Sequence, residues 1–147
     1  MSDTQVILYA EDEETDVLLM RLAVKRSALP CVLKAAMDGA EAVGYLAGTG
    51  AFADRAQHPL PCLVLLDLKM PRKNGFEVLA WIRQQPQFSR LPTIIYTSSR
   101  SEEDRERARA LGATDYVTKK CDVGEIAEWL RSIIHLCQPE PASAVGA

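Results

Sequence analysis

The sequence lacks the features that mark membrane-spanning, secreted and zinc-finger proteins. No apolar run among its 147 residues approaches the length that spans a bilayer. Residues 1–5 contain neither a basic cluster nor a long apolar stretch, which argues against a secretory signal. None of the four cysteines forms a C-x-x-C pair or stands at zinc-ligand spacing: Cys31, Cys62, Cys121 and Cys137. We therefore expect a reduced, cytoplasmic protein with no membrane partner.

An excess of basic residues is also missing. The chain has 17 Lys and Arg against 20 Asp and Glu, a net charge of −3, which argues against general nucleic-acid binding. Basic residues alternate with acids at residues 105–107, a pattern typical of a solvated helix face. With 48% hydrophobic and 25% charged residues, the composition is that of a globular protein. The length suits one domain with its own core.

Short apolar runs alternate with segments of helical character along the chain. The apolar runs predict strands over residues 5–10, 31–36, 62–67, 93–97 and 115–118. Periodicity and capping patterns predict helices over residues 14–29, 38–47, 74–85, 101–112 and 122–137. We expect a loop at 48–61 and a disordered tail at 138–147, which leaves 1–137 as the domain. Strict alternation predicts an α/β fold: a parallel sheet with helices on both faces.

Reactive side chains stand at the ends of four predicted strands. Glu11 and Asp12 follow the first strand, Asp67 ends the third, Thr97 the fourth, and Lys119 follows the fifth. In a parallel sheet these ends share one edge, where such folds place their functional site. Clustered carboxylates repel one another, and a hard cation such as Mg²⁺ relieves that repulsion. A carboxylate can accept phosphate directly, while an ammonium and a hydroxyl bind the phosphoryl oxygens.

The same segments carry a family resemblance. Over roughly residues 5–137 the chain resembles the response-regulator receiver domain of two-component signalling, through the segments ILYAEDEETD, LVLLDLKMPRKNG, IIYTSS and GATDYVTKK. The long 48–61 segment and the stretch LLDLKMPRKNGFEVL are similar to single-domain regulators that partner phytochrome-type histidine kinases. The resemblance implies a flavodoxin-like, doubly wound, five-stranded parallel sheet with strand order 2-1-3-4-5 and five helices.

The resemblance also implies roles for individual residues. Asp67 would accept a phosphoryl group from a kinase phosphohistidine. Asp12, Asp67 and the backbone carbonyl of Lys69 would bind Mg²⁺ directly, and Glu11 would act through a water molecule. Lys119 would pair with the phosphoryl group. The chain would therefore be a phosphoacceptor with its own autophosphorylation and autodephosphorylation chemistry, and not an enzyme in the usual sense.

Signalling would require a conformational switch and a partner. The family pattern implies that Thr97 moves toward the phosphoryl group and that Tyr116 swings inward. The chain ends soon after the fifth helix, so we expect output through protein contacts. The surface of helix four, strand five and helix five, or helix five alone, is the candidate for a homodimer or for contact with another protein. A sensor histidine kinase, such as a bacteriophytochrome, would act upstream. Three residues of the fifth helix are candidate contacts or ordinary core residues: Trp129, Ile133 and Ile134.

Two other function classes remain open. A degenerate receiver would bind partners without phosphorylation, but the intact set of acidic, hydroxyl and lysine residues argues against it. A haloacid-dehalogenase-type phosphatase would also use an aspartyl phosphate. Such enzymes place a second Asp two residues after the nucleophile, where this chain has Lys69.

The chain departs from the family pattern at three positions. The acidic pair is Glu11-Asp12 where many members have two Asp, and the longer Glu still reaches a metal-bound water. Lys120 follows Lys119 where a proline is usual, which leaves the family's cis peptide open because a non-proline cis bond costs about 2.5–4 kcal/mol. Lys69 occupies a position that often carries a small polar residue.

The third departure gives a prediction. An ammonium at position 69 obstructs or orients the water that hydrolyses the acyl phosphate, so Lys69→Asn should change the decay rate of phosphorylated Asp67. The measurement is the loss of phosphoryl mass with time after the phosphodonor is removed. An unchanged decay rate would refute the prediction.

Overall fold

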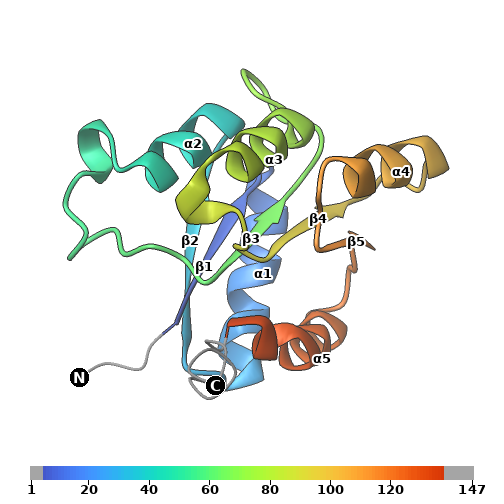
Figure 1. Ribbon diagram of the computed structural model, residues 1–147. Helices are drawn as coiled ribbons and strands as arrows, with labels where there is room; N and C mark the ends of the chain where they lie inside the picture. The colour runs from blue at the N-terminus through green and yellow to red at the C-terminus, as the bar shows by residue number, and fades with distance from the viewer. Residues whose placement is uncertain (1–4, 138–147) are drawn as a thin grey trace, which may run out of the picture.

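Five parallel strands form the centre of the protein (Figure 1). The structure is a computed structural model that describes residues 5–137, so the predicted tail lies outside the described residues. The sheet has the order β2-β1-β3-β4-β5, which confirms the predicted doubly wound topology. Its strands are β1 (Gln5–Ala10), β2 (Cys31–Ala36), β3 (Leu63–Leu66), β4 (Thr93–Thr97) and β5 (Asp115–Thr118). All five lie within a residue of their predicted bounds.

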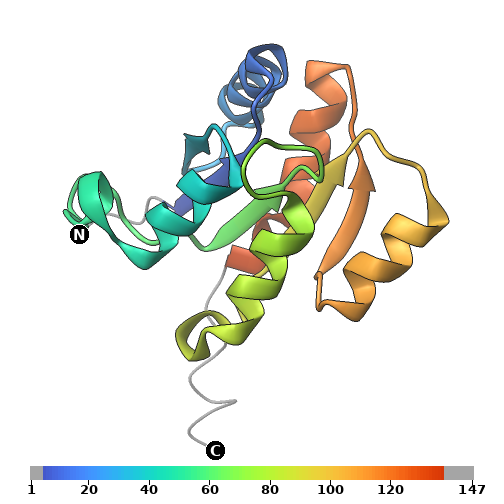
Figure 2. The ribbon, with the colours of Figure 1, turned by 90° about the horizontal axis from the view of Figure 1, so that it is seen from above.

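Helices cover both faces of the sheet (Figure 2). One face carries α1 (Glu14–Ser27) and α5 (Val123–Ile133), and the other carries α2 (Gly39–Ala47), α3 (Gly75–Gln84) and α4 (Glu102–Ala110). Short 3-10 segments are η1 (Gly50–Phe52), η2 (Pro86–Phe88) and η3 (Ile134–Cys137). Helix α1 ends earlier than predicted because Ala28 adopts a left-handed conformation, with φ of 61°. Within residues 5–137 no helix is long and apolar enough to cross a bilayer.

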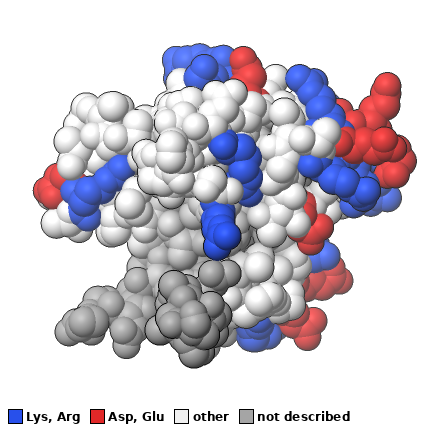
Figure 3. Space-filling view, viewed as in Figure 1, with Lys and Arg blue, Asp and Glu red and all other residues white. Residues whose placement is uncertain are grey.

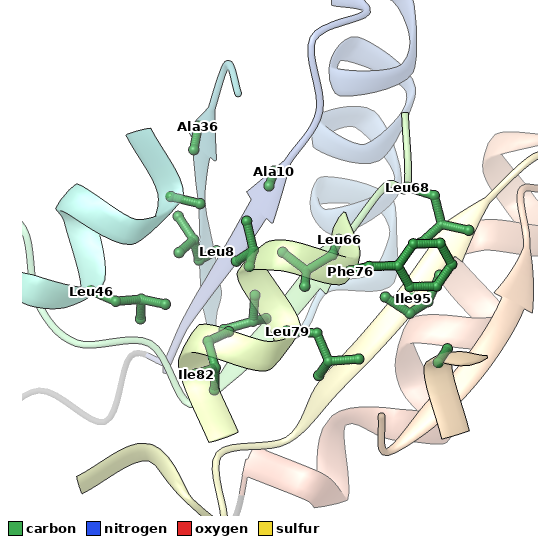
Figure 4. Close-up of a cluster of buried hydrophobic side chains, with 14 of the residues drawn as sticks. Leu8, Ala10, Ala36, Leu46, Leu66, Leu68, Phe76, Leu79, Ile82 and Ile95 are labelled. Carbon is green, nitrogen blue, oxygen red and sulfur yellow. The ribbon is translucent and has the colours of Figure 1, made fainter. Parts of the chain in front are cut away.

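Two apolar clusters fill the layers on either side of the sheet. The first lies under α2, α3 and α4, where Leu8, Leu66 and Ile95 of three neighbouring strands meet Leu79 and Ile82 of α3 (Figure 4). The second lies under α1 and α5. Strands β3 and β4 are buried at every position, as expected for central strands of a parallel sheet covered on both faces.

The predicted capping residues begin four of the helices. Asp38, Asn74, Ser101 and Asp122 each accept a hydrogen bond from the backbone N–H three residues later. Only Asn74 forms the reciprocal capping box, in which the Glu77 side chain accepts from the Asn74 N–H. These caps fix the residue at which each of the four helices begins.

Charged side chains of both signs intermingle over α4 on the face seen in Figure 3. The helix has the sequence EEDRERARA, and Ala108 is its buried position. Acidic residues fill its first turn and arginines its last, as the helix dipole favours. The prediction that residues 105–107 form a solvated helix face holds only in part. Glu106 and Arg107 are exposed, but the guanidinium groups of Arg105 and Arg107 lie over the rings of Tyr116 and Phe76.

Cys62 and Cys137 form a disulfide that joins the start of β3 to η3. Their Cα atoms are 4.9 Å apart although 75 residues separate them in sequence. The Gln5 side chain donates a hydrogen bond to the Cys137 carbonyl at 3.3 Å. The expectation that all the cysteines are reduced is wrong for this pair, because local spacing cannot reveal a contact made when α5 returns to the start of the sheet. Cys31 and Cys121 are free thiols.

Reduction of this disulfide should destabilise the fold. A cross-link over so long a segment restricts the unfolded chain and typically contributes about 2–4 kcal/mol. We expect a Tm roughly 5–15 °C lower in the presence of a thiol reductant, measured by calorimetry. Cys137→Ser should show the lower Tm without reductant, whereas Cys121→Ser should respond to reductant like the wild type. If the reductant leaves the wild-type Tm unchanged, the disulfide does not stabilise the fold.

Candidate functional site

The carboxyl edge of the sheet gathers the predicted acidic residues. Ala10 and Leu66 are partners in the ladder between β1 and β3, so the residues that follow them leave the sheet side by side. Carboxylate oxygens of Glu11, Asp12 and Asp67 all lie within 4.8 Å of one another. Glu11 and Asp67 are buried, and Asp12 is half-buried. The sequence prediction that parallel strands would bring these three side chains together is therefore confirmed in space.

Lys119 lies at the centre of this acidic group. Its Nζ is 2.6 Å from Glu11 Oε1, 2.7 Å from Asp16 Oδ2 and 3.2 Å from Asp67 Oδ2. Burial alone would lower the pKa of Lys119, but its carboxylate partners raise it above the ordinary value, so the ammonium stays charged. The backbone N–H of Lys119 donates to the Thr97 carbonyl at 2.8 Å, which fixes this residue beside the end of β4.

Sequence reasoning missed Asp16. Its place in the first turn of α1 can be read from the sequence, but its contact with Lys119, 103 residues away, cannot. Asp16 is the most exposed of the three acids bound to Lys119, with 31% of its side chain accessible.

Glu11 is held from three sides. Its Oε1 accepts from the Tyr9 hydroxyl at 3.2 Å, and its Oε2 accepts from the Glu13 N–H at 3.1 Å, in addition to the Lys119 pair. Burial and the nearby Asp67 charge raise the pKa of Glu11 to about 7, although the Lys119 ammonium and the Glu13 N–H oppose the shift. Packing thus concentrates negative charge here that the single ammonium does not fully offset.

Asp67 is positioned by the backbone of its own loop. Its Oδ1 accepts from the Leu68 N–H at 2.7 Å, and the Gly75 N–H donates to the Leu68 carbonyl at 3.1 Å. A Cβ at Gly75 would lie 2.3 Å from the Asp67 carbonyl oxygen, so only glycine allows α3 to start this close. The helix start therefore fixes the Asp67 side chain, whose Oδ2 faces Lys119.

An open pocket of about 590 Å³ gives access to this group. Its lining includes Asp12, Asp16, Asp67, Lys69 and Lys119. Lys69 is exposed at the rim, where its ammonium can reach solvent at the pocket mouth. The pocket is wide enough for a tetrahedral anion together with a hydrated cation.

The two predicted switch residues lie beside this pocket and do not line it. Thr97 is 1% exposed, and its hydroxyl accepts from the Ser99 N–H at 3.4 Å. The Tyr116 ring is already buried, with its hydroxyl donating to the Ser99 carbonyl at 2.9 Å. The Arg105 guanidinium covers that ring at 4.8 Å. Both residues therefore contact the same short segment after β4.

The loop after β5 takes an all-trans path. Among the described residues no peptide bond is cis, which settles the bond between Lys119 and Lys120 as trans in this structure. The Lys120 N–H donates to the Tyr96 hydroxyl at 3.1 Å, and the Tyr96 ring stacks on Trp129 at 4.9 Å between centroids. Packing against α5 thus positions the backbone that carries Lys119.

The donor set fits a hard divalent cation. All three acidic residues offer carboxylate oxygens, which suit Mg²⁺ and Mn²⁺, and no thiolate or imidazole joins the cluster among the described residues. Within residues 5–137 Asp12 makes no hydrogen bond or ion pair, although it lines the pocket, so its oxygens are available for a ligand.

A match to a family model identifies the chain. The model of the response regulator receiver domain covers residues 7–131, nearly the whole described fold and every acidic residue of the pocket. The chain belongs to the response-regulator receiver family. The resemblance noted in the sequence is thereby confirmed.

Individual relatives of this receiver include phytochrome response regulators. Response regulator Rcp1 of Synechocystis sp. is 33% identical over 129 residues, 88% of this chain and 86% of Rcp1, and one of its structures is of the Mn²⁺-bound form. The structure of the phosphorylated cyanobacterial phytochrome response regulator RcpA matches with a TM-score of 0.80 at 31% identity, covering 90% of this chain and 92% of that one. The structure of RPA3017, a response regulator in red light signaling of R. palustris, matches with a TM-score of 0.82 at 32% identity. The match covers 89% of this chain and 92% of RPA3017.

An ion pair anchors the receiver's β3–α3 loop, which carries Lys69, to the start of α2. The Arg72 guanidinium donates to Asp38 Oδ2, with its Nε at 2.9 Å. Burial alone would raise the pKa of Asp38, but hydrogen bonds from the Glu41 backbone and Arg72 lower it overall. Because the folded-state pKa lies below the unfolded one, this group stabilises the fold above the unfolded pKa, and the contribution disappears as pH falls through the folded value.

This shift predicts a pH-dependent mutant. Asp38→Asn keeps an acceptor for the helix cap but removes the charge, so it should lower the free energy of unfolding by about 0.5–1 kcal/mol near neutral pH, since Arg72 is mostly exposed. The loss should begin to shrink as pH falls below the unfolded Asp pKa of about 3.9 and should vanish only below the lower folded-state pKa. Urea unfolding at a series of pH values measures it. Arg72→Ala should reproduce the loss without adding to it, and a loss that persists in acid would exclude the ion pair as its cause.

Proposed function

We propose that this receiver is a phosphorylation switch in which Asp67 accepts a phosphoryl group from the phosphohistidine of a sensor histidine kinase. The observation that carries the proposal is the cluster of Glu11, Asp12 and Asp67 with Lys119 in ion-pair contact. An acceptor carboxylate, further oxygen ligands and a fixed ammonium are the groups that phosphoryl transfer to an aspartate needs. A cytoplasmic location goes with this proposal, because such kinases draw on intracellular ATP.

The transfer itself needs little chemistry from the chain. One Asp67 oxygen attacks phosphorus, the new O–P bond forms as the N–P bond of the donor breaks, and the released imidazole takes up a proton. Lys119 neutralises charge on the phosphoryl oxygens, and the Leu68 N–H holds the other Asp67 oxygen in place. Catalysis then rests on position and charge.

Mg²⁺ is the cation we propose for the site. Asp12, Asp67 and the backbone carbonyl of Lys69 would bind it directly, and Glu11 would do so through water. Bound there, the cation supplies positive charge to the phosphoryl oxygens. The geometry supports this, because carboxylate oxygens of Glu11, Asp12 and Asp67 lie within 4.8 Å of one another with one ammonium beside them.

The switch we propose runs through the segment after β4. The Thr97 hydroxyl would give up its hydrogen bond from the Ser99 N–H and turn to the phosphoryl group. This would change the contacts of the segment after β4, where the Ser99 carbonyl also accepts from the Tyr116 hydroxyl. We propose that Tyr116 takes part in this switch, and the burial of its ring beside the same segment supports the role. The output surface would be α4, β5 and α5, which lies over these residues.

Contacts on that surface would be mostly polar. Trp129, Ile133 and Ile134 pack against the core beneath α5, which favours the alternative reading of these residues as core. The large exposed apolar residues of the described region lie elsewhere: Leu18, Leu22, Val32, Met37 and Leu60. A homodimer through α4, β5 and α5 would therefore depend on the mixed charges of α4.

The kinase would dock beside the pocket mouth. Leu18 and Leu22 are exposed one turn apart on α1, the helix that also contributes Asp16 and Leu19 to the pocket lining. Large apolar side chains exposed this way mark protein contact surfaces. The similarity to phytochrome response regulators supports a phytochrome-type kinase as the partner.

Intact-mass measurement with a small phosphodonor tests the proposal. The wild type should gain one phosphoryl mass only when Mg²⁺ is present, and Asp67→Asn should gain none. Asp54→Asn is a matched control, because Asp54 is an exposed acid on the 48–61 loop. No gain in the wild type would indicate a receiver that works without phosphorylation, and continuous consumption of the donor would indicate a phosphatase.

A further inference from the structure

Asp16 is an ion-pair partner of Lys119 that competes with Asp67 for the lysine ammonium. An ammonium has three donors, and three carboxylates already use them. The Asp16 contact, at 2.7 Å, is shorter than the Asp67 contact, at 3.2 Å. A phosphoryl group on Asp67 would need at least one of these donors. One of the resting contacts must therefore weaken when phosphorylation occurs.

The contact that yields should be the one to Asp16. Glu11 is fully buried and is held by Tyr9 and the Glu13 N–H, so moving it would break several bonds. Asp16 is partly exposed and can return to water at low cost. It also lies in the first turn of α1, where the helix dipole stabilises a carboxylate that has lost its partner.

From this geometry we propose that Asp16 is a positioning residue that holds the Lys119 ammonium in the resting receiver and competes with an incoming phosphoryl group for it. The inference rests on the proposed function and deepens it. Asp16 sets how strongly the site binds the phosphoryl group, without itself touching phosphorus or the cation.

Binding of a phosphoryl analogue tests this. Fluoroberyllate with saturating Mg²⁺ mimics the phosphoryl group, and calorimetry gives its Kd. Asp16→Asn keeps the size of the side chain and removes the competing charge, so the Kd should fall roughly three- to fivefold, at the upper end of the range for a partly screened ion pair. The Kd for Mg²⁺ alone should stay the same or rise, because one nearby negative charge is lost. Damage to the fold would instead weaken both ligands.

Matched variants distinguish loss of the Asp16–Lys119 ion pair from loss of any other negative charge nearby. Glu14→Gln removes an exposed acid from the same helical turn, and the contacts to Lys119 come from other residues, so its fluoroberyllate Kd should stay within about twofold of wild type. In a Lys119→Ala background, Asp16→Asn should no longer tighten binding, because the competition needs the ammonium. Asp16→Ser provides the same test should Asp16→Asn fold poorly.

The outcomes are distinct. Unchanged or weaker fluoroberyllate binding in Asp16→Asn overturns the inference, and so does equal tightening in Glu14→Gln or persistence of the effect without Lys119. In each case a wild type that binds the analogue leaves the proposed function standing. A wild type that binds no fluoroberyllate and gains no phosphoryl mass overturns both.

Discussion

Contacts around one ammonium organise the carboxyl edge of this sheet. Lys119 reaches three carboxylates from two strand ends and one helix turn, and it does so largely out of water. Without the Lys119 ammonium, buried Glu11 and Asp67 would face each other as unpaired negative charges, which is costly at low dielectric. One positive charge among several negative ones still leaves the edge acidic. That imbalance makes the pocket suited to a cation and, with the cation, to a phosphoryl group.

The rest of the fold serves to keep these groups in place. The parallel ladder between β1 and β3 brings Glu11 and Asp67 side by side, and the trans loop after β5 carries Lys119 across to them. Gly75 lets α3 begin against the backbone of Asp67. The two apolar clusters beneath the helices hold the strands in register, so the charged edge is supported by packing on both faces (Figure 4).

Much of this could be predicted because it depends on local signals. Continuous apolar runs located the strands, and Asp38, Asn74, Ser101 and Asp122 located the helix starts, since a cap acts within one turn. The site residues followed from strand order, because parallel strands align their ends. Asp16 and the Cys62–Cys137 disulfide could not be found this way. Both depend on contacts between distant segments, for Asp16 with a lysine 103 residues away, and no local pattern encodes such contacts.

The central claim is that the carboxylates at this edge hold a divalent cation beside Asp67, the proposed phosphoacceptor. Diffraction from crystals grown with Mn²⁺ tests it most directly, through an anomalous difference map recorded at the manganese absorption edge. The account predicts one strong peak about 2 Å from oxygens of Asp12, Asp67 and the Lys69 carbonyl. A map with no peak between Asp12 and Asp67 would contradict it.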